Sequence, residues 1–385
     1  MVQSEHGKSE PQNPNNVLNE AGSIVLKIGS SLVTGEDGSP RLSWLQSLAQ
    51  DIADLQTLGK QIAITSSGAV AAGRRTLGLT GTLSLSQAQA CSALGQAKLI
   101  DAWAGAFAPL KLNVAQVLLT LSDTEDRRRY LNARNTLLTL LDLGVVPVIN
   151  ENDTVATAEL RYGDNDRLAA HAGQLIDADL LLILSDIDGL YTEDPNTSPK
   201  AQHIPYLAEV DHVHEAMASG PNAQVAIGQG GMATKLAAAK IASANGCATI
   251  IASGRKGYPI RAIKEGAKAT IIGGKENRGS ARKRWIANRL KPTGKIKIDA
   301  GAVGALKNGA SLLAAGIVEV QGDFSRGDAV LLMGSDNAPV GQGLVSYDAN
   351  EIVSELSRQR TDLPSSLGAG RRAAIIDRNN LVLKD

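Results

Sequence analysis

The segments SIVLKIGSSL (residues 23–32) and DLLLILSDIDGLY (residues 179–191) decide the fold. Each is a short, near-continuous apolar run that ends in small polar residues. Such runs are typical of strands that helices cover on both faces of a sheet. Similar apolar runs recur along the chain: QIAIT (61–65), LNVAQVLLT (112–120), GVVPVIN (144–150), CATIIAS (247–253) and ATIIGG (269–274).

The stretches between these runs have apolar residues spaced by three and four positions, which is the pattern of amphipathic helices. These stretches are residues 42–58, 86–107, 127–143, 165–176 and 232–245. Strands that alternate with helices predict a mainly parallel sheet between two layers of helices. We therefore expect an α/β domain, a three-layer αβα sandwich, over residues 22–274.

The chain has 385 residues, which is more than one domain of roughly 150 residues, so we expect further parts outside residues 22–274. Residues 1–21 are polar and rich in Asn and Pro, which favours a disordered tail. Residues 275–292 carry seven basic residues and one acidic residue, and we interpret them as a linker. Short strand-like runs separated by Gly, Asp and Asn then predict a small β-rich domain over residues 293–371 and a tail over residues 372–385.

Composition excludes several classes of protein. The 39 basic and 39 acidic residues cancel, so the sequence-wide basic excess of a dedicated nucleic-acid binder is absent. No apolar run approaches the roughly 20 residues of a membrane helix, and the first residues do not resemble a secretory signal. The two cysteines, Cys91 and Cys247, cannot build a disulfide framework. A cytoplasmic protein without a membrane partner is the expectation.

Polar residues follow several of the predicted strands, at the edge where open α/β sheets bind ligands. Lys27 lies inside the first apolar run, either as a functional cation or as a lysine that extends past a strand edge. Ser67 lies in the turn TSSGA (65–69), which fits an anion site or an ordinary helix N-cap. The clusters NEND (150–153) and GDND (163–166) fit a site for an ammonium group, a site for a metal or a hydrated Mg²⁺, or a pair of Asx turns.

Two later segments carry features of phosphate binding. The segment SDIDGLY (185–191) begins where a predicted strand ends. The segment GQGGMATK (228–235) opens a predicted helix, where glycines let the backbone approach a phosphate and Lys235 adds a positive charge. Its spacing is not that of a Walker A motif, and a glycine-rich loop alone is a weak indication.

Together these residues resemble the amino-acid kinase family, and within it the branch that phosphorylates the γ-carboxylate of glutamate as the first step of proline biosynthesis. The matching segments, between residues 23 and 291, are VLKIGSSL, TSSGAVAAGR, EDRRRYLNARNTL, VPVINENDTVATAE, RYGDNDRLAA, LLILSDIDGLYTEDP, GQGGMATKLAAA and RKRWI. The later segment GASLLAAGIVEVQGDFSRGD (309–328) is similar to the PUA domain of pseudouridine synthases and archaeosine transglycosylases.

The resemblance implies a role for each matched residue. Lys27 and Lys235 would contact the ATP phosphates and the transferring γ-phosphoryl group, and Asp166 would organise these two lysines. Further contacts to ATP would come from Ser185, Asp186, Gly230, Gly231, Met232, Ala233 and Thr234. Contacts to glutamate would come from Ser67, Asp153 and Asn165.

Two departures from the family pattern concern the ATP site. The family loop usually begins with Thr where this chain has Gln229, which changes the side chain but leaves the backbone role. Ser185 is often Thr in the family, and this change keeps the hydroxyl.

The chemistry agrees with this set of residues. A γ-carboxylate is already an anion at neutral pH, since a glutamate side chain in water has a pKa of about 4.3, so its attack on ATP needs no general base. The reaction instead needs charge neutralisation and alignment, which two lysines, backbone amides and Mg²⁺ carried by ATP would supply. We therefore expect no metal site built from side chains.

The resemblance further implies partners and regulation. The product would be a labile acyl phosphate, which the family passes to glutamate-5-semialdehyde dehydrogenase. Proline would inhibit by competing near the glutamate site, and the chain would form a homo-oligomer, a dimer or a tetramer.

Two alternatives stay open at this point. Another member of the family would phosphorylate N-acetylglutamate, carbamate, aspartate or UMP. An RNA-binding protein is the alternative from another class, because PUA domains often bind RNA. Residues 293–385 carry ten basic and eleven acidic residues, however, so the basic excess of the C-terminal part lies in the linker and RNA binding is unsupported.

Overall fold

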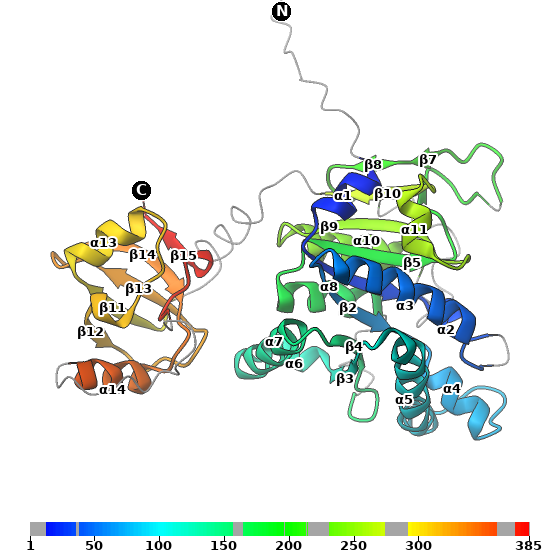
Figure 1. Ribbon diagram of the computed structural model, residues 1–385, viewed down its shortest axis with the longest axis horizontal. Helices are drawn as coiled ribbons and strands as arrows, with labels where there is room; N and C mark the ends of the chain where they lie inside the picture. Colours follow the sequence, from blue (N-terminus) through cyan, green and yellow to red (C-terminus); the bar gives the residue numbers. More distant parts are fainter. Residues whose placement is uncertain are drawn as a thin grey trace, which may run out of the picture. The chain divides into compact units, whose positions relative to one another are not determined.

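The computed structural model describes residues 13–35, 38–156, 165–195, 197–212, 214, 231–273, 292–359 and 374–384. The chain divides into two compact units, Met1–Glu125 with Ala133–Lys275 and Asp126–Asn132 with Glu276–Asp385. Each unit has its own sheet (Figure 1). None of the helices in the described part of the chain is both long enough and apolar enough to cross a bilayer.

The first unit is built on an eight-stranded sheet that is parallel except at one edge. In their order across the sheet, the strands are β3 (Val114–Leu119), β4 (Val146–Glu151), β2 (Gln61–Ser66), β1 (Ser23–Ile28), β5 (Leu180–Ser185), β9 (Ala248–Ser253), β10 (Ala269–Ile272) and β8 (Tyr206–Leu207). Only β10 and β8 run against the others. The expected parallel sheet is therefore confirmed, with β1 and β5 side by side at its centre.

Helices cover both faces of this sheet (Figure 1). One face carries α1 (Pro14–Glu20), α3 (Leu42–Thr57), α5 (Leu85–Phe107) and α11 (Pro259–Lys264), whose apolar residues form one core with Ile24, Leu26 and Ile28 of β1. The other face carries α8 (Asn165–Ile176) and α10 (Met232–Ser243), which pack on each other. The three-layer αβα sandwich expected from the sequence is confirmed.

The alternation of side chains along β1 decides where its lysine points. Ile24, Leu26 and Ile28 belong to the core beneath α3 and α5, so Lys27 faces the opposite side, toward α8 and α10. Lys27 is 5% exposed, and it pairs in the parallel ladder with Thr65 of β2. A lysine that extends past a strand edge into water is therefore the wrong interpretation.

The N-terminal prediction needs a correction. Residues 1–12 lie outside the described residues, but α1 follows directly, with the Asn13 side chain accepting a hydrogen bond from the Asn15 amide as an N-cap. Leu18 is fully buried against the sheet, and Lys60 donates to the Ala21 carbonyl at the end of this helix. Residues 13–21 are thus ordered by long-range burial of one leucine, which their polar composition conceals.

Two glycines set the packing of α5 on α4 (Ala69–Thr76), the helix that follows Ser67. A Cβ at Gly95 of α5 would overlap the Ala69 carbonyl oxygen, and a Cβ at Gly73 of α4 would overlap the carbonyl of Cys91. The two backbones therefore touch directly, and the turn before α4 is held against α5.

The second unit is small and β-rich, as the sequence predicts. Its sheet has the order β12 (Ile317–Gln321), β11 (Gly294–Ile298), β13 (Ala329–Met333), β14 (Pro339–Leu344) and β15 (Leu381–Leu383), with α13 (Ala300–Lys307) and α14 (Ala349–Gln359). The expected tail over residues 372–385 is wrong for residues 374–384. Ile375 and Ile376 are fully buried in the core of this unit, and β15 pairs with β14, because the apolar residues of this segment complete the sheet and its core. The linker over residues 275–292 lies outside the described residues except at Pro292.

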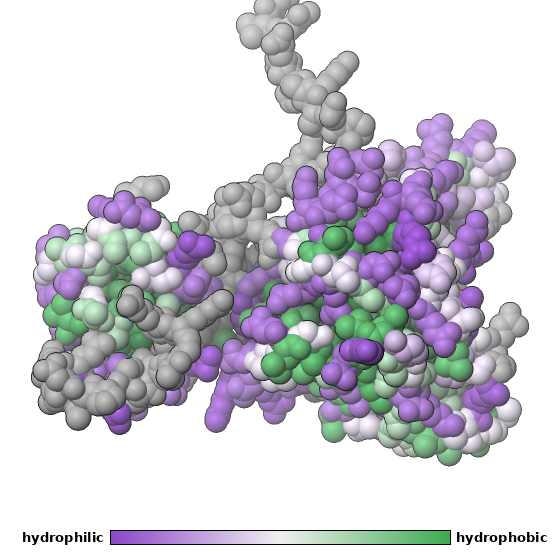
Figure 2. All heavy atoms as spheres, in the orientation of Figure 1, coloured by the Kyte–Doolittle hydropathy of each residue, from purple (hydrophilic) through white to green (hydrophobic). Residues whose placement is uncertain are grey.

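Exposed large apolar side chains are scattered over many elements of both units. Among the described residues they are Leu42, Leu58, Leu77, Leu85, Leu94, Leu143, Val155, Tyr258, Leu313, Val318 and Val353. On the face drawn in Figure 2, hydrophobic areas of the first unit alternate with hydrophilic ones. Single exposed apolar residues are normal at a protein surface, so within the described residues this distribution singles out no docking face.

Candidate active site

A buried carboxylate lies between two buried lysines at the carboxyl end of the central strands. Asp166 Oδ1 is 2.6 Å from Lys27 Nζ, and Asp166 Oδ2 is 3.5 Å from Lys235 Nζ. The Asp166 side chain is completely inaccessible to solvent. Strand β1 and the first turns of α8 and α10 each supply one member, so residues far apart in the sequence meet at one point. We call these three residues the buried triad.

Burial and charge act in opposite directions on this triad. Burial opposes ionisation of Asp166, but the ammonium groups of Lys27 and Lys235 outweigh it and hold the pKa of this carboxyl below its usual value. Burial lowers the pKa of the Lys235 ammonium, while Asp166 raises it and the nearby Lys27 lowers it further. Two cations share one anion, so the triad has a net charge of one positive. This excess suits an anionic ligand.

The N-terminus of α10 lies beside the triad. Gly231 occupies the N-cap position without a side-chain cap, and the Thr234 hydroxyl lies 2.8 Å from both Asp166 Oδ2 and the Gly231 carbonyl. Amides of a first helical turn favour negative charge in front of them. Gly231, Met232, Ala233 and Thr234 form this N-terminus, and their contact with phosphate stays a prediction, whereas Gln229 and Gly230 lie outside the described residues.

The residues predicted to bind glutamate lie at the ends of β2 and β4 and at the start of α8. Asn165 Nδ2 lies 2.8 Å from Ser67 Oγ, 2.7 Å from the Ser66 carbonyl and 3.0 Å from Asn150 Oδ1. The structure thus brings Ser67 and Asn165 together, and Asn165 directly precedes the triad carboxylate of Asp166. Asn150 is a further member that the sequence showed only as part of the NEND cluster.

Helix α5 supports this cluster from the side. Ser92 Oγ donates to Asp153 Oδ2 at 2.7 Å, and Gln96 Oε1 accepts from Asn150 Nδ2 at 3.3 Å. Both side chains are buried, Ser92 completely. Sequence reasoning missed these two residues, because polar residues on a long amphipathic helix resemble an ordinary solvated face. Their spacing of four, beside a Gly at 95, is the signal that was available.

A separate cavity of about 720 Å³ opens beside Lys235. Ser185 and Asp186 line it at the end of β5, where Ser185 Oγ donates to Asp186 Oδ1 at 2.9 Å. Gly231, Met232 and Lys235 line the same cavity, so it collects the described residues that were predicted to contact ATP, apart from Lys27, Ala233 and Thr234. Its remaining wall comes from residues that follow β5, from the end of β9 and the loop after it, and from α11 and the residues after it: Ile187, Asp188, Tyr191, Pro195, Ser253, Arg255, Lys256, Pro259, Ala262, Ala267 and Lys268.

Comparison with known proteins identifies the family of the chain. Residues 22–253 match the sequence profile of the amino acid kinase family. The chain belongs to the amino acid kinase family. This amino acid kinase also carries a PUA domain, which matches residues 294–359 in the second unit. The family resemblance seen in the sequence is confirmed.

Two similar curated proteins carry the same name. A protein from Caulobacter vibrioides named glutamate 5-kinase is 54% identical over 328 residues, which are 85% of this chain and 87% of that protein. A protein of the same name from Paramagnetospirillum magneticum is 49% identical over 362 residues, 94% of this chain and 97% of that protein. A solved UMP kinase from Ureaplasma parvum is 17% identical, with a TM-score of 0.45 over 65% of this chain and 98% of its own.

Proposed function

We propose that the protein transfers the γ-phosphoryl group of ATP to the γ-carboxylate of L-glutamate, giving ADP and L-glutamyl 5-phosphate. The observation that carries the proposal is the buried triad, in which one carboxylate holds two ammonium groups at the carboxyl ends of the central strands. Its excess positive charge suits a phosphoryl group in transit between two anions. The relatives named glutamate 5-kinase support glutamate as the acceptor.

In this proposal the protein aligns the two substrates and neutralises their negative charge, and the reaction needs no general base. A carboxylate oxygen of glutamate forms the new bond to the γ-phosphorus, while the bond to the β–γ bridging oxygen breaks and ADP leaves with that electron pair. Lys27 and Lys235 neutralise charge on the transferring group, and Asp166 fixes the positions of both ammonium groups. The first-turn amides of α10 add donors that are already oriented before the reaction.

The acceptor would lie against the cluster of Ser67, Asp153 and Asn165. Hydroxyl and amide groups would hold the α-carboxylate, and the Asp153 carboxylate would pair with the α-ammonium group. The hydrogen bond from Ser92 supports this arrangement, because it fixes one oxygen of Asp153 and leaves the carboxylate oriented.

Magnesium would arrive with ATP. The Asp166 carboxylate is engaged by two lysines and Thr234, and the described residues contain no cluster of three or more His, Cys, Asp or Glu side chains that could hold a metal. Mg²⁺ commonly binds through substrate phosphates and keeps several waters, which fits a site of this kind. It would supply additional neutralisation of the phosphate charge.

Three finer elements belong to the same proposal. Proline would compete with glutamate, the chain would act as a homo-oligomer in the cytoplasm, and the acyl phosphate would be consumed by glutamate-5-semialdehyde dehydrogenase. The lability of an acyl phosphate in water supports direct use of the product by a reducing enzyme.

A coupled ADP-release assay tests the proposal with L-glutamate, N-acetylglutamate, carbamate, aspartate and UMP as acceptors. We expect turnover with L-glutamate alone, trapping of the product by hydroxylamine, and inhibition by added proline. The absence of glutamate-dependent ADP release would overturn the assignment, and turnover with another acceptor would redirect it within the family. Repeating the assay without residues 293–385 measures what the PUA domain contributes.

Variants of the two lysines test their proposed roles. Lys27→Ala and Lys235→Ala remove one ammonium group each, so we expect kcat to fall far more than the affinity for glutamate. Near-normal turnover in either variant contradicts the mechanism.

A further inference from the structure

Helix α3 fastens the loop between β9 and α11 (residues 254–258) through three buried polar side chains. They are Trp44, Ser47 and Asp51, which are 3%, 7% and 3% exposed. Their spacing of three and four places them on one face of the helix, directed at the loop. Polar side chains on a buried face need partners, and all three find theirs in the backbone of residues 254–261.

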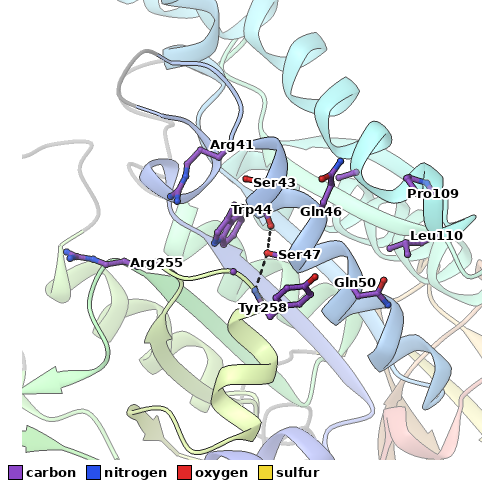
Figure 3. Close-up of a pocket in the computed structure, with 12 residues that line it drawn as sticks. Arg41, Ser43, Trp44, Gln46, Ser47, Gln50, Pro109, Leu110, Arg255 and Tyr258 are labelled. Carbon is purple, nitrogen blue, oxygen red and sulfur yellow. Dashed lines mark hydrogen bonds between the residues drawn. The ribbon is translucent and has the colours of Figure 1, made fainter.

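The contacts follow the loop in order. Trp44 Nε1 lies 2.7 Å from the Gly254 carbonyl and 3.2 Å from the Lys256 carbonyl. Ser47 Oγ accepts from the Tyr258 amide at 3.1 Å and donates to the Trp44 carbonyl at 2.7 Å, as the dashed lines in Figure 3 show. We call Trp44, Ser47 and Asp51 the α3 ladder.

Asp51 completes the ladder at the start of α11. Its Oδ2 accepts from the amides of Ile260 at 2.8 Å and Arg261 at 3.2 Å. Pro259 is the first residue of α11, so these two amides are the ones that an N-cap side chain normally satisfies. The actual N-cap residue, Tyr258, makes no such bond, and α3 supplies the missing cap from a distant part of the chain.

The loop conformation is one that it would not adopt by itself. Tyr258 has φ 54° and ψ 53°, in the left-handed region that a bulky side chain rarely occupies. A Cβ at residue 254 would overlap the end of the Leu32 side chain, so any larger residue there requires Leu32 to shift. At its first residue the loop also bonds to the end of β5, where the Gly254 amide donates to the Ser185 carbonyl at 2.7 Å.

The loop borders two cavities. Arg255 and Lys256, with the flanking Ser253 and Pro259, line the 720 Å³ cavity that contains Ser185, Asp186 and Lys235. On its other side, Arg255, Gly257 and Tyr258 line a second cavity of about 620 Å³, which Figure 3 shows beside Trp44. The loop thus has open space beside it in two cavities, and the hydrogen bonds from α3 are among the contacts that hold it in place.

We propose that Trp44, Ser47 and Asp51 are positioning residues for nucleotide binding, which place Arg255 and Lys256 at the wall of the ATP cavity without touching the nucleotide themselves. This rests on the proposed function, in which ATP occupies that cavity. Loss of a rung lets the loop leave its strained conformation, and the two cationic residues then no longer face the phosphates or the base in a fixed place. The glutamate cluster lies on other elements and is unaffected.

The test is a matched pair of tryptophan variants in the full-length protein. Trp44→Phe removes the indole donor to the loop. Trp103→Phe removes another buried indole donor, which bonds instead to Ser66 Oγ at 3.2 Å, next to Ser67. One hydrogen bond corresponds to roughly a three- to tenfold change in affinity. We expect Trp44→Phe to raise KM for ATP by that factor with KM for glutamate unchanged, and Trp103→Phe to leave KM for ATP unchanged.

Asp51 provides a rescue test. Asp51→Ala should raise KM for ATP, whereas Asp51→Asn keeps an acceptor oxygen and should restore a value near that of the wild type. Thermal unfolding of every variant measures the loss of stability separately. If both Trp44→Phe and Asp51→Ala lose stability but keep the wild-type KM for ATP, or if KM for glutamate rises equally, the ladder is only structural and the proposal fails.

Direct binding separates this inference from the proposed function. The dissociation constant of a non-hydrolysable ATP analogue, measured by calorimetry, should rise in Trp44→Phe and Asp51→Ala whether or not glutamate is the acceptor. A wild-type protein that binds the analogue but has no glutamate-dependent turnover overturns the acceptor assignment alone. Unchanged analogue binding in both variants overturns the positioning role alone.

Discussion

Replacing Asp166 by asparagine tests what one buried carboxylate does for two lysines. Asparagine keeps the shape of the side chain but removes the charge, so the ammonium groups of Lys27 and Lys235 would face each other without an anion. Removing one partner from a buried ion pair costs about 3–5 kcal/mol. Whole-domain stabilities are about 5–15 kcal/mol, so Asp166→Asn should fold but lose a large part of its free energy of unfolding at neutral pH.

The pH dependence of this loss has a defined sign. The two lysines hold the pKa of Asp166 below its unfolded value of 3.8, so the folded state binds fewer protons than the unfolded state in the range between the two values. The stability from this carboxylate is therefore fully present above pH 3.8 and disappears as the pH falls through the lower folded pKa. Urea unfolding from pH 7 to pH 3 should show the largest difference between wild type and Asp166→Asn at pH 7.

MgATP adds a second readout to this variant. If the two lysines bind the triphosphate, ATP supplies the charge that asparagine lacks, and it should raise the melting temperature of Asp166→Asn more than that of the wild type. Asp179→Asn is the control, because Asp179 accepts from the Ser23 amide at 2.8 Å at the opposite end of β1. If Asp166→Asn has the same free energy of unfolding as the wild type at pH 7, this account of the buried triad is refuted. Equal ATP-induced shifts in melting temperature for Asp166→Asn and Asp179→Asn would refute it as well.

Three further changes give separate predictions. Gly95→Ala places a Cβ on the Ala69 carbonyl, so α4 and α5 must separate. We expect the free energy of unfolding, measured with urea, to fall by about 1–3 kcal/mol. An unchanged midpoint of urea unfolding would contradict the direct contact between the two helix backbones. Ser92→Ala removes the donor to Asp153, which should raise KM for glutamate roughly two- to tenfold while KM for ATP stays constant. Equal changes in the two KM values would contradict a role of Ser92 in the glutamate site. Burial raises the pKa of Asp51 above 3.8, so the folded state binds more protons than the unfolded state between 3.8 and that raised value. The wild type should therefore gain stability relative to Asp51→Asn as the pH falls from 7 toward 3.8. A difference in the free energy of unfolding that stays constant with pH disproves this.

Local periodicity predicts most of the first unit. The helix expected over residues 165–176 is α8 with the same bounds, and the strand expected over residues 247–253 is β9 less one residue. Such segments carry their own signal, since apolar spacing matches the period of the element that buries them. The side of the sheet on which Lys27 lies follows from the same alternation once the helices are placed.

The parts that the sequence conceals depend on distant contacts. Leu18 and Ile376 lie in short segments flanked by polar residues, and only the finished sheets show that they are buried. Trp44, Ser47 and Asp51 have helical spacing in the sequence, but nothing local shows that their partners are backbone groups some 210 positions later. For the triad, residues alone left Lys27 with two interpretations, and the family resemblance supplied its pairing with Asp166.

The strand order has a consequence for synthesis. Strand β1 ends at Ile28 and its neighbour β5 begins at Leu180, so a ribosome that adds about 5–20 residues per second needs on the order of ten seconds to produce the second strand after the first. During that interval the growing chain presents β1 with the backbone N–H and C=O groups of one edge unpaired. Lys27 likewise lacks its partners until first Asp166 and then Lys235 have been synthesised. Translation that stops before Leu180 should therefore release fragments that aggregate through this edge and lack the second lysine of the phosphate site.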